Sequence, residues 1–190
     1  MMQIVLASGS PRRKQLLNML GLEFTVCPAQ GEEILPPQAG PEETVTALSR
    51  QKAAEVAGRF PADALIIAAD TIVWHDGQRL GKPKNAADAA EMLSGLSGAN
   101  HRVYTGVTLQ LGDRVLTQAE ETTVSFRALT PAEIQAYIAT GEPMDKAGAY
   151  GIQGLASLFI TGIQGDFFNV MGLPLCRLGK MLKEVGVELL

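Results

Sequence analysis

The sequence predicts one α/β domain, and three of its features support this prediction. Short apolar runs without polar alternation, at residues 4–6 and 64–74, are typical of strands buried on both faces. Segments with a helical apolar stripe and helix-capping residues lie between such runs. The partly alternating runs 101–111 and 114–126 predict an antiparallel pair of long strands. A chain of 190 residues can bury one substantial core, so we expect a single domain over residues 1–190.

The chain begins with a strand over residues 4–6, a turn of small residues and a helix. Ser10 is a typical N-cap, and Pro11 suits the first helical position because an N–H there would have no helical partner. Gly21 can adopt the left-handed conformation that ends many helices. We expect the rest of the chain to be arranged around this strand–turn–helix unit.

The start of this helix predicts an anion site. It presents free backbone N–H groups, and Ser8, Arg12 and Arg13 lie in its first turn or next to it. Cations at a helix N-terminus oppose the helix dipole and cost roughly 0.3–1 kcal/mol each unless an anion binds there. Considered alone, the pattern fits a strand–helix joint with a solvated basic face equally well.

Glu33 and Lys52 each have an ordinary and a functional interpretation. Glu33 lies in a loop rich in Pro and Gly, where a solvated charge is usual unless a cation lies opposite. The helix predicted over residues 41–57 places Lys52 four residues from both Leu48 and Val56, on its inward stripe. Lys52 can extend along the surface toward solvent, or it can direct its ammonium into a site that holds a phosphate or a carboxylate.

Asp70 interrupts the most apolar stretch, residues 64–74, which predicts the central strand of the sheet. A carboxylate in a buried strand is costly unless it is paired, bound to a metal or protonated. We therefore expect a functional role for Asp70. The dipeptide Asp76-Gly77 then predicts a hairpin turn. Lys82 follows the returning strand and is either a surface lysine or a second cation that faces a ligand.

The remaining elements are predicted from capping residues and apolar spacing, and comprise helices over residues 85–96, 130–139 and 173–185 and a strand over residues 157–163. Thr130 and Glu133 form a capping box. The segment 141–154 is dense in glycine, which indicates backbone brought close to another group.

Composition excludes several classes of protein. A net charge of −4 disfavours a broad surface for nucleic acid or for an anionic membrane. The sequence has no apolar run of about 18 residues and no leader pattern, so we expect a cytoplasmic protein without membrane partners. Cys27 and Cys176 lack the spacing of a metal or redox motif and predict buried, reduced thiols. Neither histidine lies near a nucleophile, which argues against Ser-His-Asp or Cys-His catalysis.

Cations and carboxylates without a Cys or His nucleophile are the residue types that metal-assisted phosphate chemistry needs. The carboxylates of Glu33 and Asp70 suit a hard divalent cation, Mg²⁺ or Mn²⁺, which prefers oxygen ligands. Lysine and arginine neutralise charge on phosphate oxygens as a bond breaks, and a carboxylate can accept a proton from water.

Short motifs run through nearly the whole chain, namely Ser8-Gly-Ser-Pro-Arg-Arg13, Ala69-Asp-Thr71, Gly81-Lys-Pro83, Tyr104-Thr-Gly-Val107, Asp145-Lys-Ala-Gly-Ala-Tyr-Gly-Ile-Gln-Gly154 and Val170-Met-Gly-Leu-Pro-Leu175. In this order and at this spacing they resemble the Maf family of nucleoside-triphosphate pyrophosphatases. Several are weak individually, but their joint occurrence is specific. The resemblance implies a two-lobed mixed-sheet fold with helices on both faces and a central nucleotide-binding cleft.

The resemblance also implies a reaction and a role for each matching residue. The reaction is cleavage between the α- and β-phosphates of a nucleotide, which releases a nucleoside monophosphate and pyrophosphate. Asp70 would accept the proton of the attacking water, and Glu33 with Asp70 would hold the metal ion. The implied substrate-binding residues are Ser8, Arg12, Arg13, Lys52, Thr71, Lys82 and Gln153.

Base choice follows from the same resemblance. Arg12, Thr71 and Gln153 match the positions tied to base choice in the branch that prefers dTTP and UTP. The sister branch, selective for 7-methyl-GTP, typically has Ser-Asp-Gln where this chain has Ala69-Asp-Thr71. One departure from the family is Phe167-Phe168, where a tyrosine is common after Gly-Asp.

The main hypothesis is therefore a metal-dependent pyrophosphatase for dTTP, UTP and modified pyrimidine nucleotides. The alternatives are a 7-methyl-GTP pyrophosphatase and a nucleotide-binding regulator of septum formation, a process with which the family is associated. The resemblance and general base rates favour a homodimer.

Overall fold

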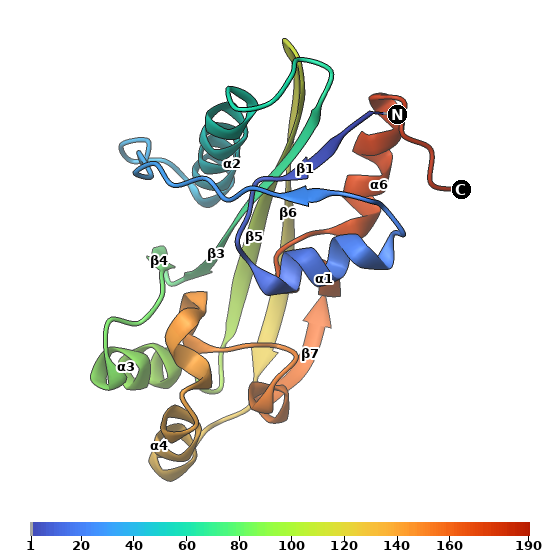
Figure 1. Cartoon of the computed structure of the whole chain (residues 1–190). Coiled ribbons are helices and arrows are strands. Elements are labelled where there is room, and N and C mark those ends of the chain that lie inside the picture. Colours follow the sequence, from blue (N-terminus) through green and yellow to red (C-terminus); the bar gives the residue numbers. More distant parts are fainter. Residues whose placement is uncertain (1) are drawn as a thin grey trace. The chain divides into compact units, whose positions relative to one another are not determined.

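A computed structural model describes residues 2–190 of the chain and contains, over those residues, a mixed seven-stranded sheet. The strands are β1 (Ile4–Leu6), β2 (Thr25–Val26), β3 (Leu65–His75), β4 (Gln78–Leu80), β5 (Asn100–Leu111), β6 (Arg114–Phe126) and β7 (Ile160–Gln164). Their order is β2-β1-β3-β5-β6-β7, and β4 pairs with β3 off this path (Figure 1). Strand β1 is parallel to β2 and β3, whereas β4 is antiparallel to β3 and β7 is antiparallel to β6. The predicted mixed α/β fold is confirmed.

The helices are α1 (Pro11–Met19), α2 (Pro41–Ala57), α3 (Ala86–Leu96), α4 (Pro131–Ala139), α5 (Phe167–Met171) and α6 (Leu175–Glu184), with the 3₁₀ helices η1 (Glu142–Asp145), η2 (Ala147–Ala149) and η3 (Leu155–Phe159). The N-caps of α3 and α4 follow the sequence signals. The Asn85 side chain accepts the N–H of Asp88, and Thr130 and Glu133 form the predicted capping box. Among residues 2–190, no helix combines the length and the apolar character needed to cross a membrane.

Two local predictions are wrong. Residues 157–159 belong to η3, and the strand begins only at Ile160. Ala156 and Phe159 are buried three residues apart, which is the spacing of a 3₁₀ turn, and an apolar run alone does not distinguish this from a strand. The two thiols are not buried either: Cys27 is partly exposed because it follows a short strand at the sheet edge, and Cys176 is exposed on α6.

The chain divides into two compact units. Unit 1 runs to Asp70 and resumes over Thr105–Glu120 and Gly172–Leu190. Unit 2 comprises Thr71–Tyr104 and Glu121–Met171. The long strands β3, β5 and β6 contribute residues to both, and β3 passes from unit 1 to unit 2 between Asp70 and Thr71.

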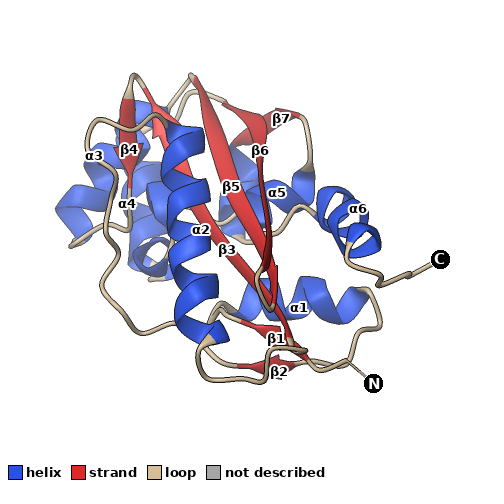
Figure 2. Cartoon of the chain, turned by 90° about the horizontal axis from the view of Figure 1, so that it is seen from above, coloured by secondary structure: helices blue, strands red, loops and turns tan. Residues whose placement is uncertain are grey.

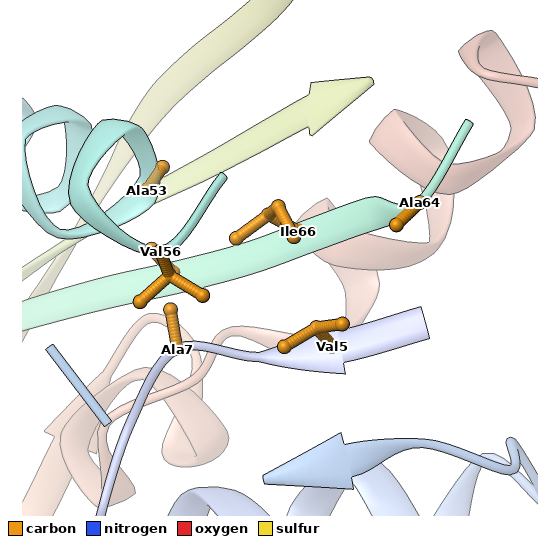
Figure 3. Close-up of a cluster of buried hydrophobic side chains, with 7 residues drawn as sticks. Val5, Ala7, Ala53, Val56, Ala64 and Ile66 are labelled. Atoms are coloured by element: carbon orange, nitrogen blue, oxygen red, sulfur yellow. The ribbon is translucent and has the colours of Figure 1, made fainter. Parts of the chain in front are cut away.

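Unit 1 is built on the parallel strands β1 and β3. Side chains of α2, including Ala53 and Val56, pack against Val5 of β1 and Ile66 of β3 (Figure 3). Helices α1 and α6 lie on the opposite face of these strands (Figures 1 and 2). The unit 1 part of strand β3 is therefore buried on both faces, as the apolar run before Asp70 predicts.

A glycine lets α2 approach the sheet. A Cβ atom at Gly106 of β5 would overlap the backbone carbonyl of Val45, the fifth residue of α2. Glycine is required at this position because any side chain would push the helix away from the strand.

Unit 2 has an aromatic cluster as part of its core. His101, Phe126 and Tyr150 make edge-to-face contacts with ring centroids 4.9–5.2 Å apart. Phe159 extends this cluster to Tyr137 of α4, with centroids 5.2 Å apart. The glycine-rich segment is thereby anchored through Tyr150, and η3 through Phe159.

Candidate active site

The Lys52 ammonium lies between two carboxylates of unit 1. Its Nζ donates to Asp70 Oδ1 at 2.5 Å and pairs with Glu33 Oε1 at 2.8 Å. The side chain of Asp70 is 10% exposed, that of Lys52 20% and that of Glu33 48%. Of the two interpretations of Lys52, the structure supports the inward one, because the ammonium meets carboxylates instead of solvent.

Backbone geometry places Asp70 and Lys52 together. Asp70 ends the part of β3 that belongs to unit 1, after five fully buried apolar residues, Leu65–Ala69. Lys52 lies on the stripe of α2 that also carries Leu48 and Val56, both buried. That stripe packs on the sheet, so a lysine there is carried to the strand that contains Asp70.

Glu33 is held near Lys52 by contacts that the sequence did not reveal. Gln51 accepts the N–H of Ile34 at 3.0 Å and donates to its carbonyl at 2.6 Å. Glu55, one turn further along α2, accepts the N–H groups of Gln30 and Gly31, both at 2.9 Å. These two backbone hydrogen bonds lower the pKa of the Glu55 carboxyl. Gln51 and Glu55 share one helix face by their spacing, but only the structure shows that the loop docks there.

The predicted anion site at α1 is organised around Ser8 and Arg13. Ser8 Oγ accepts the N–H of Ser10 and a hydrogen bond from Arg13 NH1, both at 3.2 Å. Arg13 Nε donates to the carbonyl of Gly172 at 2.7 Å. Ser10 caps α1 as predicted, and its side chain accepts the N–H of Arg13. Arg13 therefore joins the first segment of unit 1 to Gly172, where the last segment of that unit begins.

Electrostatic interactions connect Arg13 with the carboxylate pair. Burial lowers the pKa of the Arg13 guanidinium, Asp70 and Glu33 act to raise it, and the charge of Arg12 acts to lower it further. Unit 1 thus brings six of the predicted site residues together, which are Ser8, Arg12, Arg13, Glu33, Lys52 and Asp70.

Unit 2 carries the other three predicted site residues. Thr71 follows Asp70 in β3, Lys82 is exposed after β4, and Gln153 is exposed after η2. The segments of Lys82 and Gln153 are connected, because the N–H of Gly148 donates to the carbonyl of Gly81 at 3.0 Å. The catalytic, metal-binding and substrate-binding roles of all nine residues stay predictions.

The arrangement in unit 1 combines cationic side chains and a helix N-terminus with carboxylates. Within residues 2–190 no cluster contains three or more His, Cys, Asp or Glu side chains suited to a metal ion. Any metal at Glu33 and Asp70 would therefore need further ligands. The fold and this cluster define an α/β protein with a site suited to a phosphate compound.

The model of the Maf-like protein family matches residues 3–185, and the chain belongs to this family. A dTTP/UTP pyrophosphatase of Agathobacter rectalis is 50% identical over 205 residues, which cover 99% of this chain and 100% of that protein. A dTTP/UTP pyrophosphatase of Bacillus cereus (strain AH187) is 47% identical over 188 residues, which cover 99% and 98%. Among solved structures, that of the Staphylococcus aureus Ham1 protein matches with a TM-score of 0.46 and 14% identity, covering 65% of this chain and 71% of that one.

Proposed function

We propose that this protein hydrolyses dTTP and UTP to the nucleoside monophosphate and pyrophosphate. The observation that carries the proposal is the near-full-length identity of 50% and 47% to relatives that bear the name dTTP/UTP pyrophosphatase. The site in unit 1 supports the same chemistry, because it joins cations and an anion-binding helix start to a buried carboxylate.

The proton acceptor and the phosphate-binding residues have separate roles in this reaction. Asp70 accepts a proton from water as the water oxygen attacks the α-phosphorus. The bond from that phosphorus to the bridging oxygen breaks, and pyrophosphate leaves. Ser8, Arg13 and Lys52 bind phosphate oxygens, and Lys82 adds a further cation.

Base selection falls to Arg12, Thr71 and Gln153. The side chains of Thr71 and Gln153 can donate and accept hydrogen bonds at the edge of a base, and Arg12 can donate them. A pocket that reads one edge of a pyrimidine tolerates substituents elsewhere on the ring, so modified pyrimidine nucleotides are included among the substrates.

Glu33 and Asp70 fit a divalent cation that arrives with the nucleotide. Both carboxylates already accept one cation, the Lys52 ammonium, which marks a point where they converge. Magnesium is commonly bound by one or two carboxylates together with substrate phosphates and water. Such an ion, Mg²⁺ or Mn²⁺, would neutralise charge on the phosphate oxygens.

The test is pyrophosphate release from a panel of nucleoside triphosphates that includes 7-methyl-GTP, with Mg²⁺ or Mn²⁺ and with a chelator. We expect metal-dependent release led by dTTP and UTP. Release led by 7-methyl-GTP would keep the mechanism and overturn the base assignment. A folded protein that binds nucleotides but releases no pyrophosphate would instead support a role as a regulator of septum formation.

We expect the protein to form a homodimer and to be located in the cytoplasm. Homodimers are the commonest oligomers of soluble proteins. Light scattering coupled to gel filtration measures the mass of the assembly, and fractionation of cells measures its location. A monomer at all concentrations, or a protein recovered outside the cytoplasm, would contradict this expectation.

A further inference from the structure

The predicted base-selecting residue Gln153 lies on a hydrogen-bonded turn of unit 2. The N–H of Gly154 donates to the carbonyl of Gly151 at 3.1 Å, which closes a four-residue turn over residues 151–154. Ile152 is buried, and Gln153 is exposed at the corner of the turn. The position of the Gln153 amide therefore depends on how the two ends of this turn are held.

One carboxylate, that of Glu142, holds both ends. Its Oε2 accepts the N–H of Leu155, directly after the turn, at 3.1 Å. Its Oε1 accepts the hydroxyl of Tyr137 at 2.9 Å, and the Tyr137 oxygen in turn accepts the N–H of Gly151 at 3.3 Å. Glu142 thus contacts one end directly and the other end through Tyr137.

The two glycines of the turn are explained by the same contacts. A Cβ atom at Gly154 would fall on the Glu142 carboxylate, and one at Gly151 would lie 2.7 Å from Cε of Lys146. Both side chains are held in place by hydrogen bonds. Glu142 holds the two hydrogen bonds described above, and Lys146 Nζ donates to the Glu142 carbonyl at 2.7 Å. The sequence pattern Gly-Ile-Gln-Gly therefore fits a turn packed against residues 142–146.

The Tyr137 hydroxyl donates its hydrogen bond to Glu142 only while the phenol is protonated. It is 3% exposed, and its burial raises the pKa of the phenol, an effect to which the hydrogen bond to Glu142 adds. The phenol keeps its proton at any physiological pH, so the bond to Glu142 persists.

We propose that Glu142 and Tyr137 are positioning residues for base selection, because they fix the turn that presents Gln153. This inference rests on the proposed function, in which Gln153 takes part in the choice of base. Without the Glu142 carboxylate the N–H of Leu155 and the hydroxyl of Tyr137 lose their acceptor, and the turn no longer has one preferred position. The phosphate-binding residues Ser8, Arg13 and Lys52 belong to unit 1 and keep their own contacts.

The experiment compares kcat and KM for dTTP, UTP, CTP and GTP in variants of this turn. For Glu142→Ala we expect kcat/KM for dTTP and UTP to fall by about tenfold, mainly through KM, which is the size of effect that the loss of one or two net hydrogen bonds gives. The values for CTP and GTP should change by less than about twofold, so that selectivity falls. Tyr137→Phe and Glu142→Gln should lose part of the same selectivity. Glu184→Ala removes an exposed carboxylate of α6 and serves as the matched control.

A double variant tests whether Glu142 acts through Gln153. If it does, Glu142→Ala combined with Gln153→Ala has the selectivity of Gln153→Ala alone. Full additivity, or an equal loss for all four nucleotides, would overturn the inference. If circular dichroism shows that Glu142→Ala does not fold, Tyr137→Phe and Glu142→Gln decide the question.

The failure of this inference can be distinguished from the failure of the proposed function. If the unmodified protein shows no preference for dTTP and UTP, both are overturned. If the unmodified protein shows the preference and Glu142→Ala retains it, only the inference about Glu142 and Tyr137 fails.

Discussion

Replacing Lys52 by methionine should lower the free energy of unfolding, because Glu33 and Asp70 lose the cation that they share. The substitution keeps most of the length of the side chain but removes the cation between Glu33 and Asp70. Asp70 is then a carboxylate with a 10% exposed side chain that has lost its 2.5 Å partner, while a second carboxylate lies nearby. The folded state should therefore lose stability although little packing is lost.

The size of this loss can be worked from burial. Breaking a fully buried ion pair costs about 3–5 kcal/mol, because one charge is left without compensation. The pair with Glu33 is half exposed and contributes at most about 1 kcal/mol. Since Lys52 and Asp70 retain some exposure, we expect about 2–4 kcal/mol in total. For a chain of this size that corresponds to a decrease in Tm of roughly 5–12 °C.

The assay is urea unfolding of the unmodified protein, Lys52→Met, and the control Lys180→Met, which removes an exposed lysine of α6. The double variant Lys52→Met with Asp70→Asn should regain most of the lost stability, since its buried side chain is uncharged. Divalent cations should stabilise Lys52→Met more than the unmodified protein if Glu33 and Asp70 can hold them. A Lys52→Met protein as stable as Lys180→Met would refute the reasoning.

Three further predictions follow from particular contacts. Asp70→Asn should lower pyrophosphate release from dTTP by at least about 100-fold while circular dichroism shows a folded protein, and near-normal turnover would exclude Asp70 as the proton acceptor. Gly106→Ala should cost about 1–3 kcal/mol in urea unfolding, because its Cβ overlaps the carbonyl of Val45, and an unchanged midpoint would contradict this. Burial, with a smaller contribution from His75, lowers the pKa of His101 from 6.5 to about 4, so that only the unfolded state gains a proton there between these values. Stability should be fully present above pH 6.5 and fall by up to about 3 kcal/mol toward pH 4, and His101→Gln should lack that part of the slope in unfolding measured across this range.

Much of the fold could be predicted from the sequence because its signals are local. The helix from Pro41, the capping box at Thr130 and the turn at Asp76-Gly77 depend on residues a few positions apart. A prediction is wrong where one local pattern fits two kinds of secondary structure. The apolar residues at 157–159 fit both a strand and a 3₁₀ helix, and the structure has η3 there. A functional role for Asp70 could be predicted because a carboxylate is unusual within an apolar strand.

The partners within the site could not be predicted, because they depend on where loops dock. The sequence places Lys52 on the inward stripe of α2, but only the contacts with Asp70 and Glu33 distinguish its two interpretations. The position of Glu33 depends on Glu55 and Gln51, which hold the backbone before and after it, respectively. Backbone groups are the same in every residue, so a sequence carries no sign of which ones a side chain will bind.

Several glycines of the family motifs make contacts with residues far away in the sequence. The carbonyl of Gly172 accepts the Arg13 guanidinium, although 159 positions separate the two residues. Gly106 allows the carbonyl of Val45 to approach β5, and Gly154 leaves room for the Glu142 carboxylate. In each case the glycine meets a residue outside its own motif, or one that no motif contains. At Gly106 and Gly154 a side chain would break the contact, and at Gly172 the contact is made by the backbone carbonyl, so a family motif also marks positions that the fold itself requires. It follows that residues such as Glu142, which lie opposite these glycines, help to explain why the glycines are needed.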